Sequence, residues 1–184
     1  MKTYVALLRG INLGARNKVA MADLRALFDG LGAEDVATYL QSGNVVFKSS
    51  DGGEKLTGAI QRRIRRDLDL SIAVIVLTRP QLAKVLAGNP FAKGKQDPTK
   101  LHVTFLAENP ARTKVSKLDP ERAEPDEFRL VGKQIYLHCP NGYGRTKLTN
   151  AYFEKQLGVT ATTRNWRTVT TLLELARQAE GSSK

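Results

Sequence analysis

The chain has 184 residues, of which 41% are hydrophobic, and its formal net charge is +11. This composition excludes an intrinsically disordered chain and provides a core for one large domain or two small ones. The sequence shows neither a signal-peptide pattern nor the run of about 20 apolar residues that crosses a bilayer, so we expect a cytoplasmic protein without a membrane partner. A single cysteine, Cys139, excludes an internal disulfide.

The positive charge favours ligands that carry phosphate groups. Lys and Arg side chains attract anions through charge and donate hydrogen bonds to phosphate oxygens. A basic surface that binds nothing is the alternative interpretation.

Residues 1–78 follow the order strand, helix, strand, strand, helix, strand. Short apolar and β-branched runs indicate the strands, and apolar residues spaced by three or four indicate the helices. Gly43 provides the positive φ that a tight turn between the second and third strands requires. The predicted strands are 2–8, 36–40, 45–48 and 72–77, and the predicted helices are 21–31 and 54–68. The order β-α-β-β-α-β is that of a ferredoxin-like unit.

The second predicted helix has a positively charged side opposite its apolar stripe. Arg62, Arg63, Arg65 and Arg66 fall there at 100° per residue. A solvated helix face is the default interpretation, and a nucleic-acid contact is the alternative.

Residues 79–100 are predicted to form a short helix and a linker. Thr78 and Gln81 have the spacing of a capping box around Pro80, and Gly88 ends the helix. Two prolines, one glycine and three lysines follow before residue 101, which is a composition typical of a linker.

Residues 101–184 repeat the same order and add a C-terminal helix. The predicted strands are 101–107, 128–131, 134–137 and 159–164, and the predicted helices are 109–118, one ending near 157, and one capped by Asn165. The chain from Glu180 onwards is a polar tail with no reason to be ordered. We therefore predict an α+β protein with two ferredoxin-like units, at 1–78 and 101–184, joined by 79–100.

A glycine-rich segment over residues 141–149 has the features of an anion site. Gly142 and Gly144 allow a positive φ and a close approach of the backbone to a ligand. Thr146 stands where a helix N-cap is expected, with Arg145 and Lys147 beside it. This combination suits a phosphate group, although the spacing differs from that of a Walker loop.

Four segments of the chain resemble the signature segments of the bacterial family called domain of unknown function 1697. The segments are Leu8-Arg9-Gly10-Ile11-Asn12-Leu13-Gly14, residues 39–47, residues 140–150 and Ala161-Thr162-Thr163-Arg164-Asn165-Trp166. The resemblance implies a two-part α+β protein and marks these segments as important, but it implies no particular activity. Where many relatives have serine this chain has Thr146, which keeps the hydroxyl group.

Residues of these segments are the candidate ligand contacts, because their amides, hydroxyls and positive charges suit phosphate, sugar or base atoms. Tyr143 and Trp166 also offer flat surfaces for a base. The alternatives are structural: Asn12 and Asn44 as turn residues, Asn165 as a helix cap and Trp166 as a core anchor. The predicted ligand-binding residues are Arg9, Asn12, Lys18, Gln41, Ser42, Asn44, Asn141, Tyr143, Gly144, Arg145, Thr146, Lys147, Arg164 and Asn165.

The signals for enzymatic chemistry are poor. His102 and His138 lie inside strand-like runs without the spacing of a metal site or a catalytic triad, so both are interpreted as packing residues. Cys139 follows an apolar run and is interpreted as a buried thiol. We predict no metal and no cofactor.

Three functions remain open at this point. The first is binding of nucleic acid, RNA in particular, or of a nucleotide. The second is a metal-independent enzyme acting on a phosphorylated small molecule. The third is a protein-interaction adaptor. The binding prediction requires Arg9, Arg145, Lys147 and Arg164 to meet in one electropositive hollow.

Overall fold

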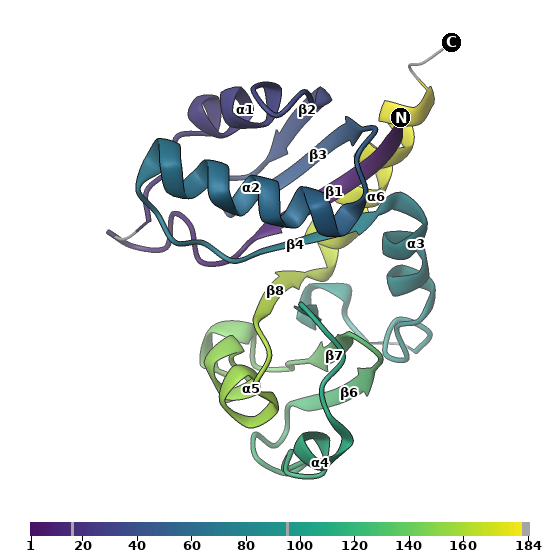
Figure 1. Ribbon diagram of the computed structural model, residues 1–184. Helices are drawn as coiled ribbons and strands as arrows, with labels where there is room; N and C mark the ends of the chain where they lie inside the picture. The colour runs from purple at the N-terminus through teal and green to yellow at the C-terminus, as the bar shows by residue number, and fades with distance from the viewer. Residues whose placement is uncertain (16, 95, 182–184) are drawn as a thin grey trace. The chain divides into compact units, whose positions relative to one another are not determined.

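The computed structural model describes residues 1–15, 17–94 and 96–181. The chain divides into two compact units: unit 1 comprises residues 1–83 and the chain from Thr171 onwards, and unit 2 comprises residues 84–170. Each unit contains a four-stranded antiparallel sheet with helices packed on it (Figure 1). The predicted α+β class with a C-terminal helix is therefore confirmed.

Unit 1 has the predicted order of elements, and its strands lie in the order β2-β3-β1-β4. The three strand pairs β2–β3, β3–β1 and β1–β4 are all antiparallel. The elements are β1 (Lys2–Leu8), α1 (Met21–Asp29), β2 (Glu34–Tyr39), β3 (Asn44–Ser49), α2 (Gly53–Leu68) and β4 (Val74–Thr78).

One face of this sheet packs against α1 and α2, which lie on the same side of it in Figure 1. Alternate residues of β1 face these helices because strand side chains alternate between the two faces. Tyr4 and Leu8 thus share a core with Phe28 of α1 and Ile60 of α2. The ring of Phe28 meets that of Phe47 edge to face, with centroids 4.9 Å apart.

Unit 2 repeats the order, with strands arranged β6-β7-β5-β8. Its core contains Phe153 of α5 and the β7 residues Ile135 and Leu137. The elements are β5 (Leu101–Leu106), α4 (Arg112–Val115), β6 (Glu127–Val131), β7 (Gln134–His138), α5 (Asn150–Leu157) and β8 (Ala161–Asn165), with 3-10 turns at Pro98–Lys100 and Tyr143–Arg145.

Two helices have residues in both units: α3 (Arg79–Ala87) and α6 (Trp166–Gly181). The predicted capping box of α3 is confirmed, because Thr78 N donates to Gln81 Oε1 (2.8 Å) and Gln81 N donates to Thr78 Oγ1 (3.3 Å). In the described part of the chain, no helix has the length and apolar character that crossing a bilayer requires.

Two predicted elements were wrong. The helix predicted over 109–118 is a single turn, α4, because only Val115 and Leu118 reach the core and no continuous apolar stripe supports a longer helix. The tail predicted from Glu180 is instead helical as far as Gly181. Glu180 forms an ion pair with Arg79 (2.6 Å), which holds this end of α6 on unit 1. Residues 182–184 of the predicted tail, and Lys95 of the predicted linker, lie outside the described residues.

Candidate ligand-binding site

In unit 1, Asn12 joins the loop after β1 to the β2–β3 turn. Its Nδ2 donates hydrogen bonds to the carbonyl oxygens of Val19 (3.0 Å) and Gln41 (2.8 Å), and its Oδ1 accepts one from Val19 N (2.8 Å). Its backbone is left-handed, with φ of 54°, a conformation that asparagine tolerates better than most residues. The side-chain amide of Asn12 is thus used within the fold.

The β2–β3 turn itself is closed by Asn44, whose side chain is fully buried. Asn44 Nδ2 donates to Tyr39 O and to Ser42 Oγ, both at 2.9 Å. The neighbouring Gly43 has φ of +80°, and its carbonyl accepts a hydrogen bond from Leu8 N (2.8 Å). Asn44 and Ser42 therefore have structural contacts in the turn.

The remaining candidates of unit 1 lie nearer the surface. Arg9 is half-buried, and its backbone N–H donates to Ala73 O (2.9 Å). Lys18 and the side chain of Gln41 are exposed. Arg16, which lies between Arg9 and Lys18 in the sequence, is outside the described residues.

The arginine face of α2 is partly neutralised within unit 1. Arg63 donates to Gly30 O at the end of α1 (2.9 Å) and to the carboxylate of Asp67. Arg66 also donates to Asp67 (2.6 Å), which lowers the pKa of that carboxyl group through hydrogen bonds from Arg66 and Arg63. Arg62 and Arg65 remain exposed. This arrangement agrees with a solvated helix face.

In unit 2, the glycine-rich segment leaves β7 through a sharp turn. Gly142 has φ of +89°, and its N–H donates to Cys139 O (2.9 Å). A 3-10 turn, Tyr143–Arg145, follows. The prediction that Thr146 is a helix N-cap was wrong: Thr149 caps α5 by accepting from Tyr152 N (3.2 Å).

The reason for this shift is the burial of Leu148, which is 1% exposed and belongs to the core of unit 2. The chain at Thr146 is extended (ψ 149°), and Thr146 Oγ1 accepts a hydrogen bond from Leu148 N (3.1 Å). Arg145 and Lys147 therefore do not flank the first turn of a helix. Any anion they bind must be held by their side chains and by the neighbouring loop.

Tyr143 packs into unit 2 rather than projecting from it. Its ring stacks on His102, with centroids 4.7 Å apart and planes 22° from parallel. Burial raises the pKa of the Tyr143 hydroxyl, which also interacts with Thr163. One face of the ring is thus covered by His102, and Gly144 beside it has no atom near enough to contact an added Cβ.

Arg164 lies inside unit 2 on β8 and is only 8% exposed. Its Nη1 donates to Thr162 Oγ1 (2.8 Å) and to Thr163 O (2.9 Å). Burial lowers its pKa to about 10, because the charged guanidinium is removed from water. Arg164 contributes to the interior of the sheet and does not line the cavities described next.

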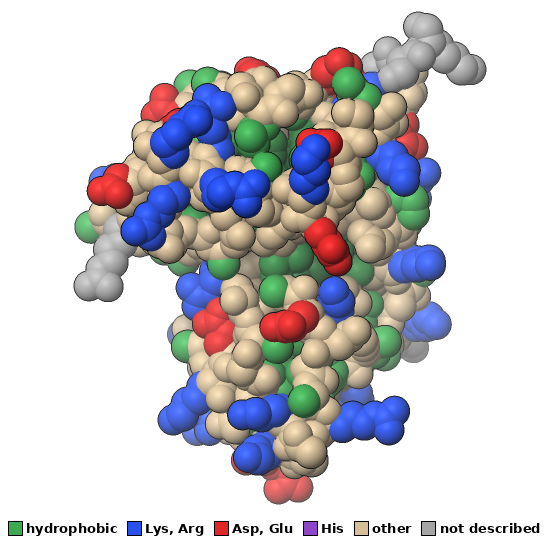
Figure 2. Space-filling model, in the orientation of Figure 1, with side chains coloured by type: hydrophobic (Ala, Val, Ile, Leu, Met, Phe, Trp, Pro, Cys, Tyr) green, Lys and Arg blue, Asp and Glu red, His purple; other side chains and the backbone are tan. Residues whose placement is uncertain are grey.

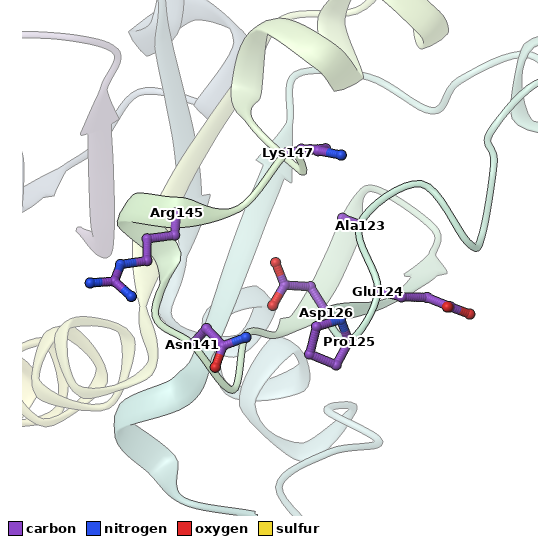
Figure 3. Close-up of a pocket in the computed structure, with 7 residues that line it drawn as sticks. All are labelled: Ala123, Glu124, Pro125, Asp126, Asn141, Arg145 and Lys147. Carbon is purple, nitrogen blue, oxygen red and sulfur yellow. The ribbon is translucent and has the colours of Figure 1, made fainter.

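Three of the predicted ligand residues do line one cavity of unit 2, which we call the Asp126 hollow. It has a volume of about 200 Å³ and is formed where the loop before β6 meets the glycine-rich segment. Its lining residues are Ala123, Glu124, Pro125, Asp126, Asn141, Arg145 and Lys147 (Figure 3).

Asp126 occupies the middle of this hollow in Figure 3, between Asn141 and Lys147. It is 8% exposed, and its Oδ1 is buried without a hydrogen-bond partner among the described residues. The guanidinium of Arg145 and the ammonium of Lys147 are exposed at the rim and directed away from the carboxylate, while the Asn141 amide faces it. The hollow thus combines a positive rim with one inner carboxylate.

A second cavity of unit 2, the α6 cavity, has a volume of about 440 Å³. It contains one predicted residue, Asn165, whose Oδ1 accepts a hydrogen bond from Thr168 N (2.7 Å) and so provides the predicted cap of α6. Its lining residues are Pro98, Thr99, His102, Asn165, Trp166, Arg167 and Thr170.

The sequence did not single out Asp126 and Arg167, each of which lines one of the two cavities. Asp126 lies in the loop before β6, and only its long-range proximity to Asn141 and Arg145 reveals the hollow. No local signal could have found it. Arg167 directly follows Asn165-Trp166, so the signature segment ending at Trp166 was a signal that pointed to its neighbourhood.

Other reactive groups are few in the described part of the chain. Within residues 1–15, 17–94 and 96–181, no three His, Cys, Asp or Glu side chains gather in a way that could hold a metal ion. Cys139 is fully buried, as predicted, and burial raises the pKa of its thiol to about 11. The thiol is therefore neutral at physiological pH.

Comparisons with known proteins place this chain in a family. The family described as "Protein of unknown function (DUF1697)" matches residues 1–136, a range that includes two of the four signature segments. A conserved bacterial protein from Streptococcus pneumoniae has a similar structure, with a TM-score of 0.72 and 24% sequence identity over 95% of this chain and 98% of that one. This likeness shows a shared fold and extends beyond residue 136. A search of curated proteins finds no match. The chain belongs to the DUF1697 family of proteins of unknown function.

Proposed function

We propose that the protein binds a phosphate-bearing ligand, with the phosphate at the positive rim of the Asp126 hollow. The observation that supports this proposal is that Asn141, Arg145 and Lys147 all line one cavity. These residues were selected from the sequence for their ability to bind phosphate. The guanidinium of Arg145 can give a phosphate two parallel hydrogen bonds, and Lys147 adds a second positive charge.

Asp126 restricts the class of ligand. A carboxylate repels phosphate, so the phosphate group occupies the rim and a different part of the ligand reaches Asp126. That part carries an N–H or O–H donor, because the buried Oδ1 of Asp126 has no partner among the described residues. A nucleotide has both parts, since its base amino group or ribose hydroxyl can donate to the carboxylate.

The size of the hollow favours a mononucleotide or the end of a strand over a long nucleic acid. Its volume of about 200 Å³ accommodates a small group beside the phosphate. Figure 2 shows Lys and Arg side chains spread singly over the visible face, with Asp and Glu side chains among them. A continuous basic stripe, which typically follows a nucleic-acid backbone, is not seen on this face.

A thermal-shift screen tests the proposal directly. Nucleoside mono- and diphosphates, sugar phosphates and inorganic phosphate are compared, because a ligand that binds the folded state raises the unfolding midpoint by mass action. We expect a nucleotide to raise the midpoint more than inorganic phosphate does at the same concentration, since inorganic phosphate has no separate group for Asp126.

Two double variants distinguish binding at the Asp126 hollow from a general effect of the protein's net charge. Arg145→Ala with Lys147→Ala removes the rim of the hollow, whereas Arg112→Ala with Lys114→Ala removes two exposed charges of α4 that line no part of it. The first variant is expected to lose the nucleotide-dependent shift and the second to keep it. A flat screen with the unaltered protein, or an equal shift in both double variants, would overturn the proposal.

Asp126→Asn provides a third comparison, because it keeps the shape of the side chain and removes its charge. We expect this variant to bind inorganic phosphate more tightly than the unaltered protein, since the repulsion is gone. Unchanged phosphate binding in Asp126→Asn would show that the anion does not lie near the carboxylate.

A further inference from the structure

The α6 cavity is separate from the Asp126 hollow and shares none of its lining residues. It lies where the first turn of α6, the end of β8 and the 3-10 turn Pro98–Lys100 come together within unit 2. Its volume of about 440 Å³ falls within the roughly 300–1,000 Å³ of typical small-molecule sites.

The wall of this cavity offers an aromatic surface. Trp166 lines it and is half-buried. Pro98 adds an apolar ring to the same wall. A flat ligand can bury its faces against such rings, which gain energy from stacking as well as from the area removed from water.

His102 supplies a polar group to the cavity wall. The residue is 8% exposed, lines the cavity, and stacks on the ring of Tyr143. Its Nδ1 is buried and has no hydrogen-bond partner among the described residues. Buried polar groups in folded proteins nearly always have a partner, so an unsatisfied one beside a cavity is an indication of a missing ligand.

Among the described residues that line the cavity, one carries a charge. Arg167 is the charged side chain of the lining set, and it is exposed at the cavity mouth. Burial lowers the pKa of His102, so its imidazole is neutral at pH 7 and adds no charge. The first turn of α6 leaves backbone N–H groups without partners inside the helix, of which Thr168 N is satisfied by Asn165.

We infer that the α6 cavity binds a planar aromatic ring that carries one carboxylate group. The ring lies against Trp166 and Pro98, and the carboxylate lies at Arg167, whose planar guanidinium matches it with two hydrogen bonds. A polar substituent on the ring is positioned to reach His102. This site does not depend on the phosphate site proposed above.

The single tryptophan of the chain makes a sharp test available, because Trp166 lines this cavity. The full chain is titrated with benzoate, 4-hydroxybenzoate and naphthalene-2-carboxylate. The fluorescence of Trp166 is recorded with selective excitation of tryptophan. Benzamide serves as the uncharged aromatic control and cyclohexanecarboxylate as the non-aromatic acid. We expect a saturable change with at least one aromatic acid and binding about tenfold weaker with either control compound.

Matched variants locate the carboxylate. Arg167→Gln and Arg177→Gln remove one exposed charge each from the same helix, but only Arg167 lines the cavity. We expect the aromatic acid to bind about tenfold more weakly to Arg167→Gln and with unchanged affinity to Arg177→Gln. His102→Phe keeps a ring beside Tyr143 and is expected to weaken 4-hydroxybenzoate more than benzoate. Circular dichroism melts verify that each variant folds.

Four results would overturn the inference. They are no saturable change with any aromatic acid, equal affinity for cyclohexanecarboxylate, equal affinity in Arg167→Gln and Arg177→Gln, or a response to adenosine monophosphate without a response to the carboxylates. The double variant Arg145→Ala with Lys147→Ala should bind the aromatic acid normally. If the phosphate-site proposal fails, the fluorescence result still tests the α6 cavity. If the α6-cavity inference fails, the thermal-shift screen still tests the phosphate site.

Discussion

At Gly43 the fold requires the absence of a side chain. An ideal Cβ at this position would lie 2.8 Å from Leu8 Cβ and 2.9 Å from Ile11 Cγ1, and the backbone has φ of +80°. Gly132, in the β6–β7 turn, also has a positive φ (60°) but has no atom within 4 Å of an ideal Cβ. An added side chain at Gly43 therefore meets both backbone strain and steric overlap, whereas one at Gly132 meets backbone strain alone.

We predict that Gly43→Ala lowers the free energy of unfolding by roughly 2–4 kcal/mol, since strain and overpacking both contribute. Gly132→Ala, which has the strain alone, should lower it by about 1–2 kcal/mol. Chemical denaturation of both variants measures the difference. Equal losses would show that the β2–β3 turn can move away from Leu8 and Ile11.

His102 gives the second prediction at this scale, because burial lowers its pKa below the ordinary value of 6.5. Below about pH 6.5 the unfolded chain binds a proton at this residue that the folded chain does not. Stability is therefore lost as pH falls through that range. The thermal midpoint of His102→Phe should drop less between pH 7.5 and 5.5 than that of the unaltered protein. An identical drop would mean that His102 is accessible to protons in the folded state.

The sequence did not show which of the many candidate residues are free to bind a ligand and which have a structural role. Asn12 and Asn44 were chosen because amides bind ligands, but their hydrogen bonds lie within unit 1. Arg164 was chosen for its charge, yet its strand position places it in the interior. Residue type indicates what a side chain can bind, and only the fold decides whether that capacity is already used.

At the scale of elements, two helix caps predicted from neighbouring residues were confirmed. The α3 capping box and the Asn165 cap of α6 each join groups three residues apart, so the sequence contains both partners. The cap of α5 was placed three residues early because Thr146 and Thr149 are both suitable hydroxyls. The burial of Leu148, a tertiary effect, decides between them.

We predict that Thr149→Ala lowers the free energy of unfolding by about 1 kcal/mol, the usual value of an N-cap hydroxyl. Thr149→Ser keeps the hydroxyl that accepts from Tyr152 N and should lose only a few tenths of that amount. Urea titrations of the two variants provide the comparison. A neutral effect of Thr149→Ala would contradict the assignment of this cap.

At the scale of the whole molecule, the sequence predicted two α+β units because each contains the complete β-α-β-β-α-β pattern. The candidate site was predictable only in part. Asn141, Arg145 and Lys147 are close in sequence, whereas Asp126 reaches them through the fold alone. The proposed site therefore depends on one contact between segments that no local pattern describes.

The net charge of +11 leads to a further prediction at this scale. Mixed RNA should bind weakly at low salt, with log K falling by about 0.7 per phosphate contact for each unit of log salt. The double variants at Arg145/Lys147 and at Arg112/Lys114 should lose similar affinity for RNA, since each loses two charges. A much larger loss at Arg145/Lys147 would instead identify the hollow as part of a nucleic-acid interface.

The most direct test of the phosphate site is a crystal structure of the protein with the best nucleotide from the thermal-shift screen. The proposed function predicts phosphate density within hydrogen-bond distance of Arg145 or Lys147, and a ligand N–H or O–H group facing the Asp126 carboxylate. Phosphate density at any other position, with the Asp126 hollow holding only water, would contradict it.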